Sequence, residues 1–189
     1  MTKRCSWAAS SEIYSRYHDE EWGKPLHDDQ KLFEFLILEG MQAGLSWITI
    51  LKKRETFRIA FDDFDVKKVA AYDCGKVEEL MNNPGIIRNR LKVEAAVNNA
   101  RRFLEIVAEF GSFDTYIWGF VGHQPIINHW EQLTDVPATT ELSDQISADL
   151  KRRGFKFVGS TVVYSHMQAT GMVNDHLVSC FCHPENSGQ

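Results

Sequence analysis

Apolar residues recur along this chain at intervals of three and four positions, and alternation with a period of two is almost absent. Such spacing lines apolar side chains along one face of an α-helix, so the pattern predicts an all-α protein. Glycines and polar cap residues divide the pattern into segments. The predicted helices cover 28–38, 46–57, 65–72, 76–81, 91–108, 112–120, 143–152, 158–169 and 174–181. The longest stretch without a helical pattern is 124–140.

Two of these helices have recognisable start signals. Asp28-Asp29 precede a strongly apolar segment that ends near Leu38, and Ser46 precedes the next helical pattern. Side-chain oxygens of Asp and Ser accept hydrogen bonds from the first free N–H groups of a helix, so we expect both positions to be caps.

The composition is that of an ordinary globular protein. The chain has 189 residues, of which 43% are hydrophobic and 25% charged. No apolar run approaches the roughly 18 residues of a membrane span, so we expect no membrane association. The residues Met1–Trp7 are not followed by the apolar core of a signal peptide, which leads us to expect a cytoplasmic protein.

The net charge is −5, which argues mildly against indiscriminate binding to nucleic acid. The positive charge is clustered, however, since thirteen of the 21 Lys and Arg residues lie in 52–58, 88–102 and 151–156. Three basic segments could form one surface that faces phosphates. The alternative is that they are solvated helix faces.

Cysteine and histidine are concentrated near the two ends of the chain. Cys5 and His18 stand near the start, and His176 and Cys180 stand near the end, four residues apart on a predicted helix. Two Cys and two His form the ligand set of a closed, tetrahedral structural zinc site. Spacing alone leaves open that they are ordinary thiols and imidazoles. It also leaves competing ligands, which are His123, His129 and His166, whereas Cys182 would point to the other side of the predicted helix.

Aromatic residues are dense in the first quarter of the chain, around one carboxylate. Glu39 follows an apolar helix and precedes a glycine-containing turn, where a negative charge opposes the helix dipole. Glu39 is either exposed there or set in a pocket. With Tyr17 and Trp47 around it, such a pocket would favour a flat, cationic ligand such as a methylated adenine. The alternative is that these aromatic residues pack in the core.

The segment 82–92 lies between two predicted helices and contains Pro84-Gly85-Ile86-Ile87. It resembles the helix-hairpin-helix motif, in which a tight turn and a helix N-terminus point N–H groups at a DNA phosphate. Arg88, Arg90 and Lys92 supply positive charge. Ile87 stands where the motif has its second glycine, so a plain turn between helices is the alternative.

Together these residues resemble the DNA-3-methyladenine glycosylase I family of the helix-hairpin-helix superfamily, from about Cys5 to Pro184. The stretches that carry this resemblance are Tyr17-His18-Asp19, Glu21-Trp22-Gly23, Leu38-Glu39-Gly40, Gln42-Ala43-Gly44-Leu45-Ser46-Trp47, Ile50-Leu51-Lys52-Lys53-Arg54, Arg153-Gly154-Phe155-Lys156-Phe157-Val158-Gly159 and Asn174-Asp175-His176.

The resemblance implies a set of roles for these residues. It implies one structural Zn²⁺ at Cys5, His18, His176 and Cys180. It implies a base pocket at Glu39, Tyr17 and Trp47, lined also by Trp7, Tyr14 and Trp22. DNA contacts are implied at the wedge turn Gln42, Gly44 and Leu45, and at the hairpin residues Gly85, Ile86, Arg88, Arg90 and Lys92. Asp114 lies about where other glycosylases of the superfamily carry a catalytic Asp, a role that this branch lacks.

The resemblance also implies an organisation and a reaction. We expect one compact unit over 1–189, with a helix-hairpin-helix core at 30–149 and a zinc-linked part made of 1–29 and 150–189. The implied reaction is hydrolysis of the N-glycosidic bond of 3-methyladenine in alkylated double-stranded DNA after base flipping, without strand nicking. Nothing in the sequence indicates an obligate oligomer, so we expect a monomer.

Two other functions compete with this interpretation. A non-catalytic DNA-binding module would bind duplex DNA without releasing a base. A metalloenzyme that uses the Cys/His site chemically would need an exchangeable ligand position and would lose activity at once on chelation.

Overall fold

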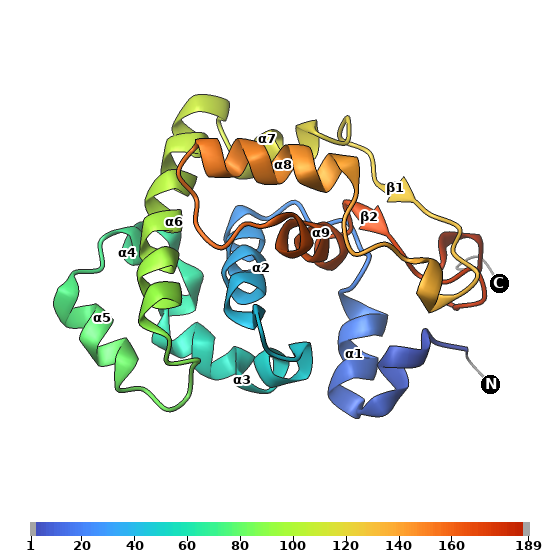
Figure 1. Ribbon diagram of the computed structural model, residues 1–189, viewed down its shortest axis with the longest axis horizontal. Helices are drawn as coiled ribbons and strands as arrows, with labels where there is room; N and C mark the ends of the chain where they lie inside the picture. The colour runs from blue at the N-terminus through green and yellow to red at the C-terminus, as the bar shows by residue number, and fades with distance from the viewer. Residues whose placement is uncertain (1–2, 187–189) are drawn as a thin grey trace.

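The computed structural model describes residues 3–186 and is mainly helical, which confirms the predicted fold class (Figure 1). The α-helices are α1 Glu12–Glu20, α2 Asp29–Gln42, α3 Trp47–Ala60, α4 Val66–Ala70, α5 Cys74–Met81, α6 Arg90–Phe110, α7 Phe113–Gly119, α8 Glu141–Arg152 and α9 Ser160–Ala169. Short 3₁₀ helices are η1 Ser6–Ser10, η2 Asp62–Phe64, η3 Leu133–Asp135 and η4 Pro184–Asn186. Two strands, β1 Ile126–Ile127 and β2 Val173–Asn174, pair in parallel.

Helix α2 is the central element of the fold. It contacts α3, α6, α7 and α9, and ten consecutive residues, 32–41, are buried. A helix that is apolar on nearly all sides must be covered on all sides, which explains why α2 carries Glu39 into the interior. The apolar core around it includes Phe33, Leu38 and Met41.

The two predicted caps have different outcomes. The Asp28 carboxylate accepts a hydrogen bond from the Lys31 N–H at 2.9 Å, so this cap is confirmed. Ser46 does occupy the N-cap position of α3, but its hydroxyl bonds the Thr49 hydroxyl and not the backbone. The Tyr14 hydroxyl accepts from the Ile48 N–H at 3.0 Å instead, which ties α1 to the start of α3.

The N-terminal helix α1 and the turn η1 were not predicted from the apolar pattern. The segment 12–20 is mostly polar and carries only a few apolar or aromatic positions. A local start signal was present, since the Ser11 side chain accepts from the Tyr14 N–H at 3.3 Å. The helix is held by tertiary contacts of its aromatic face with η1 and α3.

The predicted helix at 174–181 is wrong. Residues 173–174 form β2, and turns follow it. The reason is tertiary pairing, because the Asn128 N–H donates to the Asn174 carbonyl at 3.1 Å and the Val178 N–H donates to the Trp130 carbonyl at 3.0 Å. An extended segment that is paired in this way cannot also form helical hydrogen bonds.

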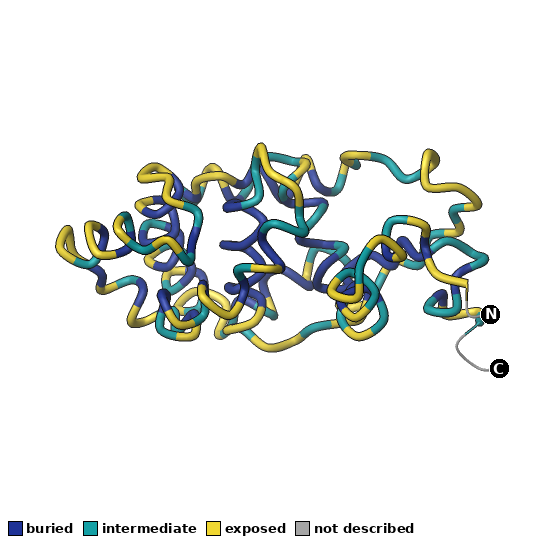
Figure 2. The backbone as a smooth tube through the Cα atoms, turned by 90° about the horizontal axis from the view of Figure 1, so that it is seen from below, coloured by how far each residue is buried: buried dark blue, intermediate teal, exposed yellow. Residues whose placement is uncertain are grey.

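The N-terminal and C-terminal segments lie side by side at one end of an elongated body (Figure 1). The buried backbone runs through the middle of this body and exposed positions outline it (Figure 2). Helix α9 contacts both α2 and α8, and its Val163, Tyr164 and Met167 belong to the main core.

The division of the chain into a core at 30–149 and a terminal part stays a prediction. None of the helices within residues 3–186 has the length and apolar character needed to cross a membrane.

Candidate active site and metal cluster

A pocket of about 300 Å³ opens beside the C-terminal half of α2. It is lined by Trp7, Tyr14, Tyr17, Trp22, Glu39, Gln42, Trp47, Leu133, Val136, Ser165 and Gln168. The structure therefore brings together the six pocket residues named from the sequence, which come from η1, α1, the turn after α1, α2 and α3. A pocket of this size and apolar lining suits a small planar ligand.

Glu39 is the only acidic residue among the residues that line this pocket. It lies in the last turn of α2, within the helix and not after it, and is only 4% exposed. Within residues 3–186 no hydrogen-bond donor reaches its carboxyl group. Burial in this apolar site raises the pKa of Glu39 to about 8. The pocket thus holds a carboxyl group whose acceptor oxygens have no protein partner.

Trp47 contributes the complementary polar group. Its indole N–H is buried and makes no hydrogen bond of normal geometry within the described residues. The Tyr17 ring lies 5.6 Å from the Trp47 ring. Burial and then the charge of Glu39 raise the pKa of Tyr17 well above its ordinary value, although the nearby indole N–H of Trp47 partly offsets this. The pocket therefore contains an unpaired acceptor, an unpaired donor and a neutral phenol.

The other predicted aromatic residues form the outer wall of the pocket. The Trp7 ring packs edge-to-face on Tyr14 at 5.5 Å and on Trp22 at 5.1 Å. Trp22 also packs against the His176 ring at 4.7 Å, which links the pocket wall to the Cys/His cluster. Edge-to-face contacts of this kind hold aromatic rings in defined orientations.

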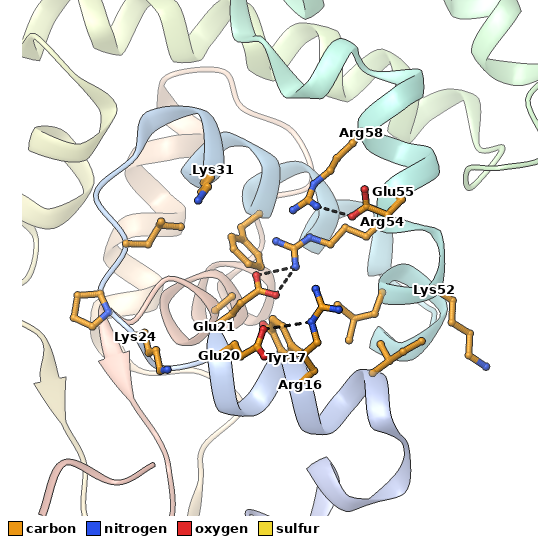
Figure 3. Close-up of a pocket in the computed structure, with 16 residues that line it drawn as sticks. Arg16, Tyr17, Glu20, Glu21, Lys24, Lys31, Lys52, Arg54, Glu55 and Arg58 are labelled. Carbon is orange, nitrogen blue, oxygen red and sulfur yellow. Dashed lines mark hydrogen bonds and ion pairs between the residues drawn. The ribbon is translucent and has the colours of Figure 1, made fainter. Parts of the chain in front are cut away.

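A larger cleft of about 770 Å³ lies on the other side of Tyr17 (Figure 3). Each of its three carboxylates is paired with an arginine, in the pairs Arg16–Glu20, Arg54–Glu21 and Arg58–Glu55. Figure 3 shows the Arg54 guanidinium turned toward Glu21. Arg54 also donates to Glu34 at 2.6 Å and lies 4.9 Å from the Phe35 ring, so this network fastens α1 to α2 and α3 behind the pocket.

The predicted wedge forms a tight turn between α2 and α3. The Leu45 N–H donates to the Gln42 carbonyl at 2.6 Å, and the Gln42 side chain donates to the Leu45 carbonyl at 3.3 Å. Gly44 has a φ of +82°, which only glycine adopts without strain. The Leu45 side chain is 40% exposed beside the pocket residue Gln42. This geometry is suited to filling a gap in a base stack.

The hairpin between α5 and α6 is fastened to α3. The Lys53 ammonium donates to the Pro84 carbonyl at 2.9 Å, and the Thr56 hydroxyl donates to the Gly85 carbonyl at 2.5 Å. A Cβ on Gly85 would lie 3.0 Å from Thr56 Cβ, so this close approach requires glycine. The Gly85 N–H donates to the Asn83 side chain at 2.8 Å and is already used.

The hairpin residues named from the sequence differ in their surroundings. Ile86 is buried, so only its backbone could approach DNA. Arg90 pairs with Glu78 at 2.7 Å, and Arg88 is exposed and has no side-chain partner among residues 3–186. Lys92 is buried, and its ammonium donates to the carbonyls of Met41 and Ala43 at 2.9 and 2.6 Å. The structure thus gives Lys92 an internal partner in place of the expected phosphate.

The two ends of the chain meet in a buried cluster of Cys5, His18, His176 and Cys180, whose potential ligand atoms all lie within 4.8 Å of one another. His18 Nε2 lies 3.2 Å from His176 Nδ1 and 3.4 Å from Cys180 Sγ. Cys180 Sγ lies 3.6 Å from His176 Nδ1. The predicted quartet is therefore assembled, although His176 and Cys180 lie in an irregular segment and not on the predicted helix.

The donor set fits a metal ion. The other nitrogens of the two rings are engaged elsewhere, since His18 Nδ1 lies 2.8 Å from the Asp19 carboxylate and His176 Nε2 lies 2.9 Å from the Trp22 carbonyl. If His18 Nδ1 and His176 Nε2 both donate hydrogen bonds, the lone pairs of His18 Nε2 and His176 Nδ1 face each other. A cation between these two nitrogens would stabilise that arrangement. Contact with Cys5 and both imidazoles lowers the pKa of Cys180, while Cys180 and burial raise the pKa of Cys5. Thiolate and imidazole are the ligands that zinc prefers.

The competing ligands do not join this quartet. His166 is buried elsewhere, with Nε2 3.0 Å from the Leu32 carbonyl, and burial lowers its pKa to about 4. His129 lies 3.0 Å from Glu185. Cys182 does not point away, as a helix would require, because its sulfur lies 3.9 Å from His18 Nδ1. Asp114 bonds His27 at 2.7 Å and does not line the pocket.

Comparison with known proteins places the chain in a family. A family model described as methyladenine glycosylase matches residues 7–183. The chain belongs to the methyladenine glycosylase family. It is 50% identical to DNA-3-methyladenine glycosylase 1 of Escherichia coli strain K12, over 97% of this chain and 98% of that protein.

Solved structures of this family have the same fold. One crystal structure of 3-methyladenine DNA glycosylase I, 50% identical, superposes with a TM-score of 0.94 over 96% of this chain and 100% of the other. A second, 39% identical, is a tyrosine-to-phenylalanine variant of 3-methyladenine DNA glycosylase I in complex with 3-methyladenine, with a TM-score of 0.93 over 96% of this chain and 97% of that one. The chain is thus an enzyme of a glycosylase family, and glycosylases are hydrolases.

Sequence reasoning missed one buried residue that organises this methyladenine glycosylase. Asp175 is 1% exposed and accepts four hydrogen bonds, at 2.6 to 2.8 Å, from Asn128, Trp130, Tyr164 and Gln168. It thereby positions the pocket residue Gln168 and the loop that leads to Leu133. Its place in Asn174-Asp175-His176, beside a predicted metal ligand, was the signal in the sequence.

Proposed function

We propose that this enzyme hydrolyses the N-glycosidic bond of 3-methyladenine in alkylated double-stranded DNA and leaves the DNA strand intact. The observation that carries the proposal is the buried Glu39 carboxyl group, which has no hydrogen-bond donor in the described structure and lies within an aromatic pocket. A buried polar group without a partner is costly, so its retention indicates that a ligand supplies the partner.

Methylated adenine supplies what the pocket lacks. Methylation at N3 gives the base a positive charge in the nucleotide, which favours the ionised form of Glu39 and pulls its pKa down from about 8. The exocyclic amino group can donate to Glu39, and a ring nitrogen can accept from the unpaired Trp47 N–H. Tyr17 and Trp47 offer flat faces to a cationic ring.

The reaction needs no general acid, because the methylated base is already a cationic leaving group. The enzyme must extrude the nucleotide, select the base and favour the separating charges. Attraction between Glu39 and the intact cationic base aids binding, and only contacts that improve as the bond breaks accelerate cleavage. No lysine lines the pocket, so we infer that water attacks and that no Schiff base forms.

The surface around the pocket supports binding to duplex DNA. Leu45 is exposed on its rigid turn and would fill the space that the flipped nucleotide leaves. Arg88 is exposed at the hairpin. The Asn89 side chain caps the Lys92 N–H at 3.2 Å, whereas the N–H groups of Arg90 and Leu91 before it have no intrahelical acceptor. Arg88 and these two N–H groups would face a phosphate. All the pocket residues come from one chain, so the proposal requires only a monomer.

We further propose that the Cys5, His18, His176 and Cys180 cluster holds one Zn²⁺. With four protein ligands the ion would be a structural clamp between the chain ends, since no position stays open for substrate. Asp19 would orient His18, and the Arg4 guanidinium would hold Asp19 through a bond of 2.7 Å.

Chromatography of bases released from methylated duplex DNA tests the function. We expect free 3-methyladenine, with 7-methylguanine retained in the DNA, and strong impairment in Glu39→Gln. Release of both bases would support the glycosylase function but refute a pocket that is specific for 3-methyladenine. Release of neither base by folded, zinc-loaded protein would make a non-catalytic DNA-binding module the better account.

A further inference from the structure

The loop between α8 and α9 belongs to none of the elements used above. It contains Arg153-Gly154-Phe155-Lys156-Phe157-Val158-Gly159, the last part of a strongly basic stretch. Lys156 and Phe157 are both exposed, and 38% of the Phe157 surface is open to solvent. A large aromatic side chain that is exposed on a short, firmly held loop is often a contact site for a partner.

Helices α6 and α8 fasten this loop on the two sides of Phe157. The Asn98 side chain donates to the Gly154 carbonyl at 2.8 Å. The buried Asn99 side chain donates to the Lys156 carbonyl and accepts from the Lys156 N–H, both at 2.8 Å. On the other side of Phe157, the Ser147 hydroxyl donates to the Val158 carbonyl at 2.6 Å. The backbone around Phe157 is therefore held in one conformation.

That conformation is unfavourable for the residue that occupies it. Phe157 has a φ of +55°, in the left-handed region that glycine adopts freely and a side chain with a Cβ does not. A glycine at this position would avoid the strain. Strain that the surrounding structure enforces often occurs where a side chain must be presented to a ligand.

The loop presents Phe157 at the same end of α2 as the wedge. A Cβ built on Gly40 would lie 3.4 Å from Phe157 Cβ, so the side chain starts directly above the helix residue that follows Glu39. It borders the groove between α2 and α6 together with Lys92, whose ammonium holds the Ala43 carbonyl of the wedge turn. Two exposed apolar side chains, Leu45 and Phe157, thus flank the last turn of α2.

We propose that Phe157 is a second apolar DNA contact, packing against the bases beside the flipped nucleotide while Lys156 faces a phosphate. The inference rests on the proposed glycosylase function and assigns a role to an exposed basic and aromatic loop near the wedge. Aromatic side chains that contact unstacked bases contribute to binding whatever the base, because every base has a flat face. Leu45 would fill the gap and Phe157 would support the bent duplex next to it.

The test compares Phe157→Ala with Phe110→Ala. Phe110 has the same exposed fraction, 38%, but lies at the opposite end of α6 from the hairpin. We measure binding to a duplex with a tetrahydrofuran abasic analogue, and binding of free 3-methyladenine by tryptophan fluorescence. We expect Phe157→Ala to bind the duplex about tenfold more weakly, with unchanged affinity for the free base, and Phe110→Ala to bind both normally. Unchanged duplex binding by Phe157→Ala overturns the proposal.

Two further variants separate contact from packing. Phe157→Gly removes the ring and also relieves the left-handed strain, so it should fold well and bind the duplex weakly. Phe157→Trp keeps a flat ring and should keep most of the affinity. If Phe157→Gly binds the duplex like the wild type, or loses free-base affinity in step with duplex affinity, the ring only packs on α2 and the proposal is wrong.

The same experiments keep the two proposals apart. Absence of 3-methyladenine release by the wild-type enzyme refutes the proposed function, whereas the duplex-binding comparison still judges Phe157. Release by the wild type together with normal duplex binding by Phe157→Ala refutes this inference alone.

Discussion

The ammonium of Lys92 lies 2.6 Å from the carbonyl oxygen of Ala43, so the first turn of α6 is tied directly to the turn that carries Leu45. The same ammonium holds the Met41 carbonyl near the C-terminus of α2, where a positive charge is favourable. Burial lowers the pKa of Lys92. Lys92 therefore couples the hairpin to the wedge through the interior of the protein.

Replacing Lys92 by Met tests whether the Lys92 ammonium stabilises the fold or contacts DNA. Lys92→Met leaves two carbonyl groups without their donor, so we expect a loss of about 1–3 kcal/mol in the free energy of unfolding. Because the ammonium is directed at two carbonyl oxygens inside the protein, we expect the dependence of duplex affinity on salt to keep its wild-type slope. Denaturant unfolding and affinity measured at several salt concentrations check the two expectations.

Arg88→Ala is the matched surface variant at the same hairpin. Arg88 is exposed, so its removal should change stability by less than about 0.5 kcal/mol. It should reduce the slope of log affinity against log salt by about 1, as expected for one lost phosphate contact. An equal reduction of the slope in Lys92→Met would show that Lys92 does contact phosphate.

Glu39→Gln should stabilise the protein at alkaline pH. The folded protein holds the Glu39 proton up to about pH 8, whereas the unfolded chain releases it near 4.5. Between these values the unfolded state binds fewer protons, so the stability of the wild type falls as pH rises. Each unit of pKa difference corresponds to about 1.4 kcal/mol, so above pH 8 the wild type loses several kcal/mol in the free energy of unfolding. Gln does not titrate, so the variant should not lose this stability.

Thermal unfolding of both proteins from pH 5 to pH 9 measures this effect. The difference in Tm between Glu39→Gln and wild type should grow with pH through this window. A difference that is the same at pH 5 and pH 9 would show that Glu39 is ionised in the folded protein throughout. Excision by the variant should be low at every pH, because it lacks the carboxylate.

If the proposed Zn²⁺ is bound, its removal should lower the stability of the protein under conditions where base release still continues. A structural ion contributes its binding free energy to folding, so a chelator should lower the Tm, and Cys180→Ser should do the same. At a temperature where the treated protein is still folded, release of 3-methyladenine should continue. Immediate loss of release from protein that is still folded would point to a catalytic metal instead.

Asp175→Asn should be among the most damaging single substitutions outside the core. Four donors converge on the buried carboxylate, and an amide offers them one oxygen and a competing NH₂ group. We expect a loss of about 3 kcal/mol or more in the free energy of unfolding, measured by denaturant unfolding. The exposed Glu131→Gln is the control and should stay within about 0.5 kcal/mol of wild type.

The central helices could be predicted because their signals are local. Apolar spacing and the Asp28 cap lie within a few residues of the helix that they specify, and α2 and α6 appear where the pattern places them. Helix α1 was missed because its polar sequence has little apolar periodicity. The helix predicted at 174–181 was wrong because pairing with 126–130 overrides the local preference of this segment.

By itself the sequence determined the types of chemistry, namely two Cys and two His near the ends, one carboxylate within an apolar helix, and a basic hairpin. Only the tertiary structure decided where these groups point. His18 meets Cys180 because long-range backbone hydrogen bonds, such as the Phe181 N–H to the Lys3 carbonyl, bring the chain ends together, not because a helix spaces the ligands. Glu39 lacks a partner and Lys92 has one because packing around α2 buries the first in a pocket and turns the second inward. Such outcomes depend on contacts between residues far apart in the chain, which local periodicity does not encode.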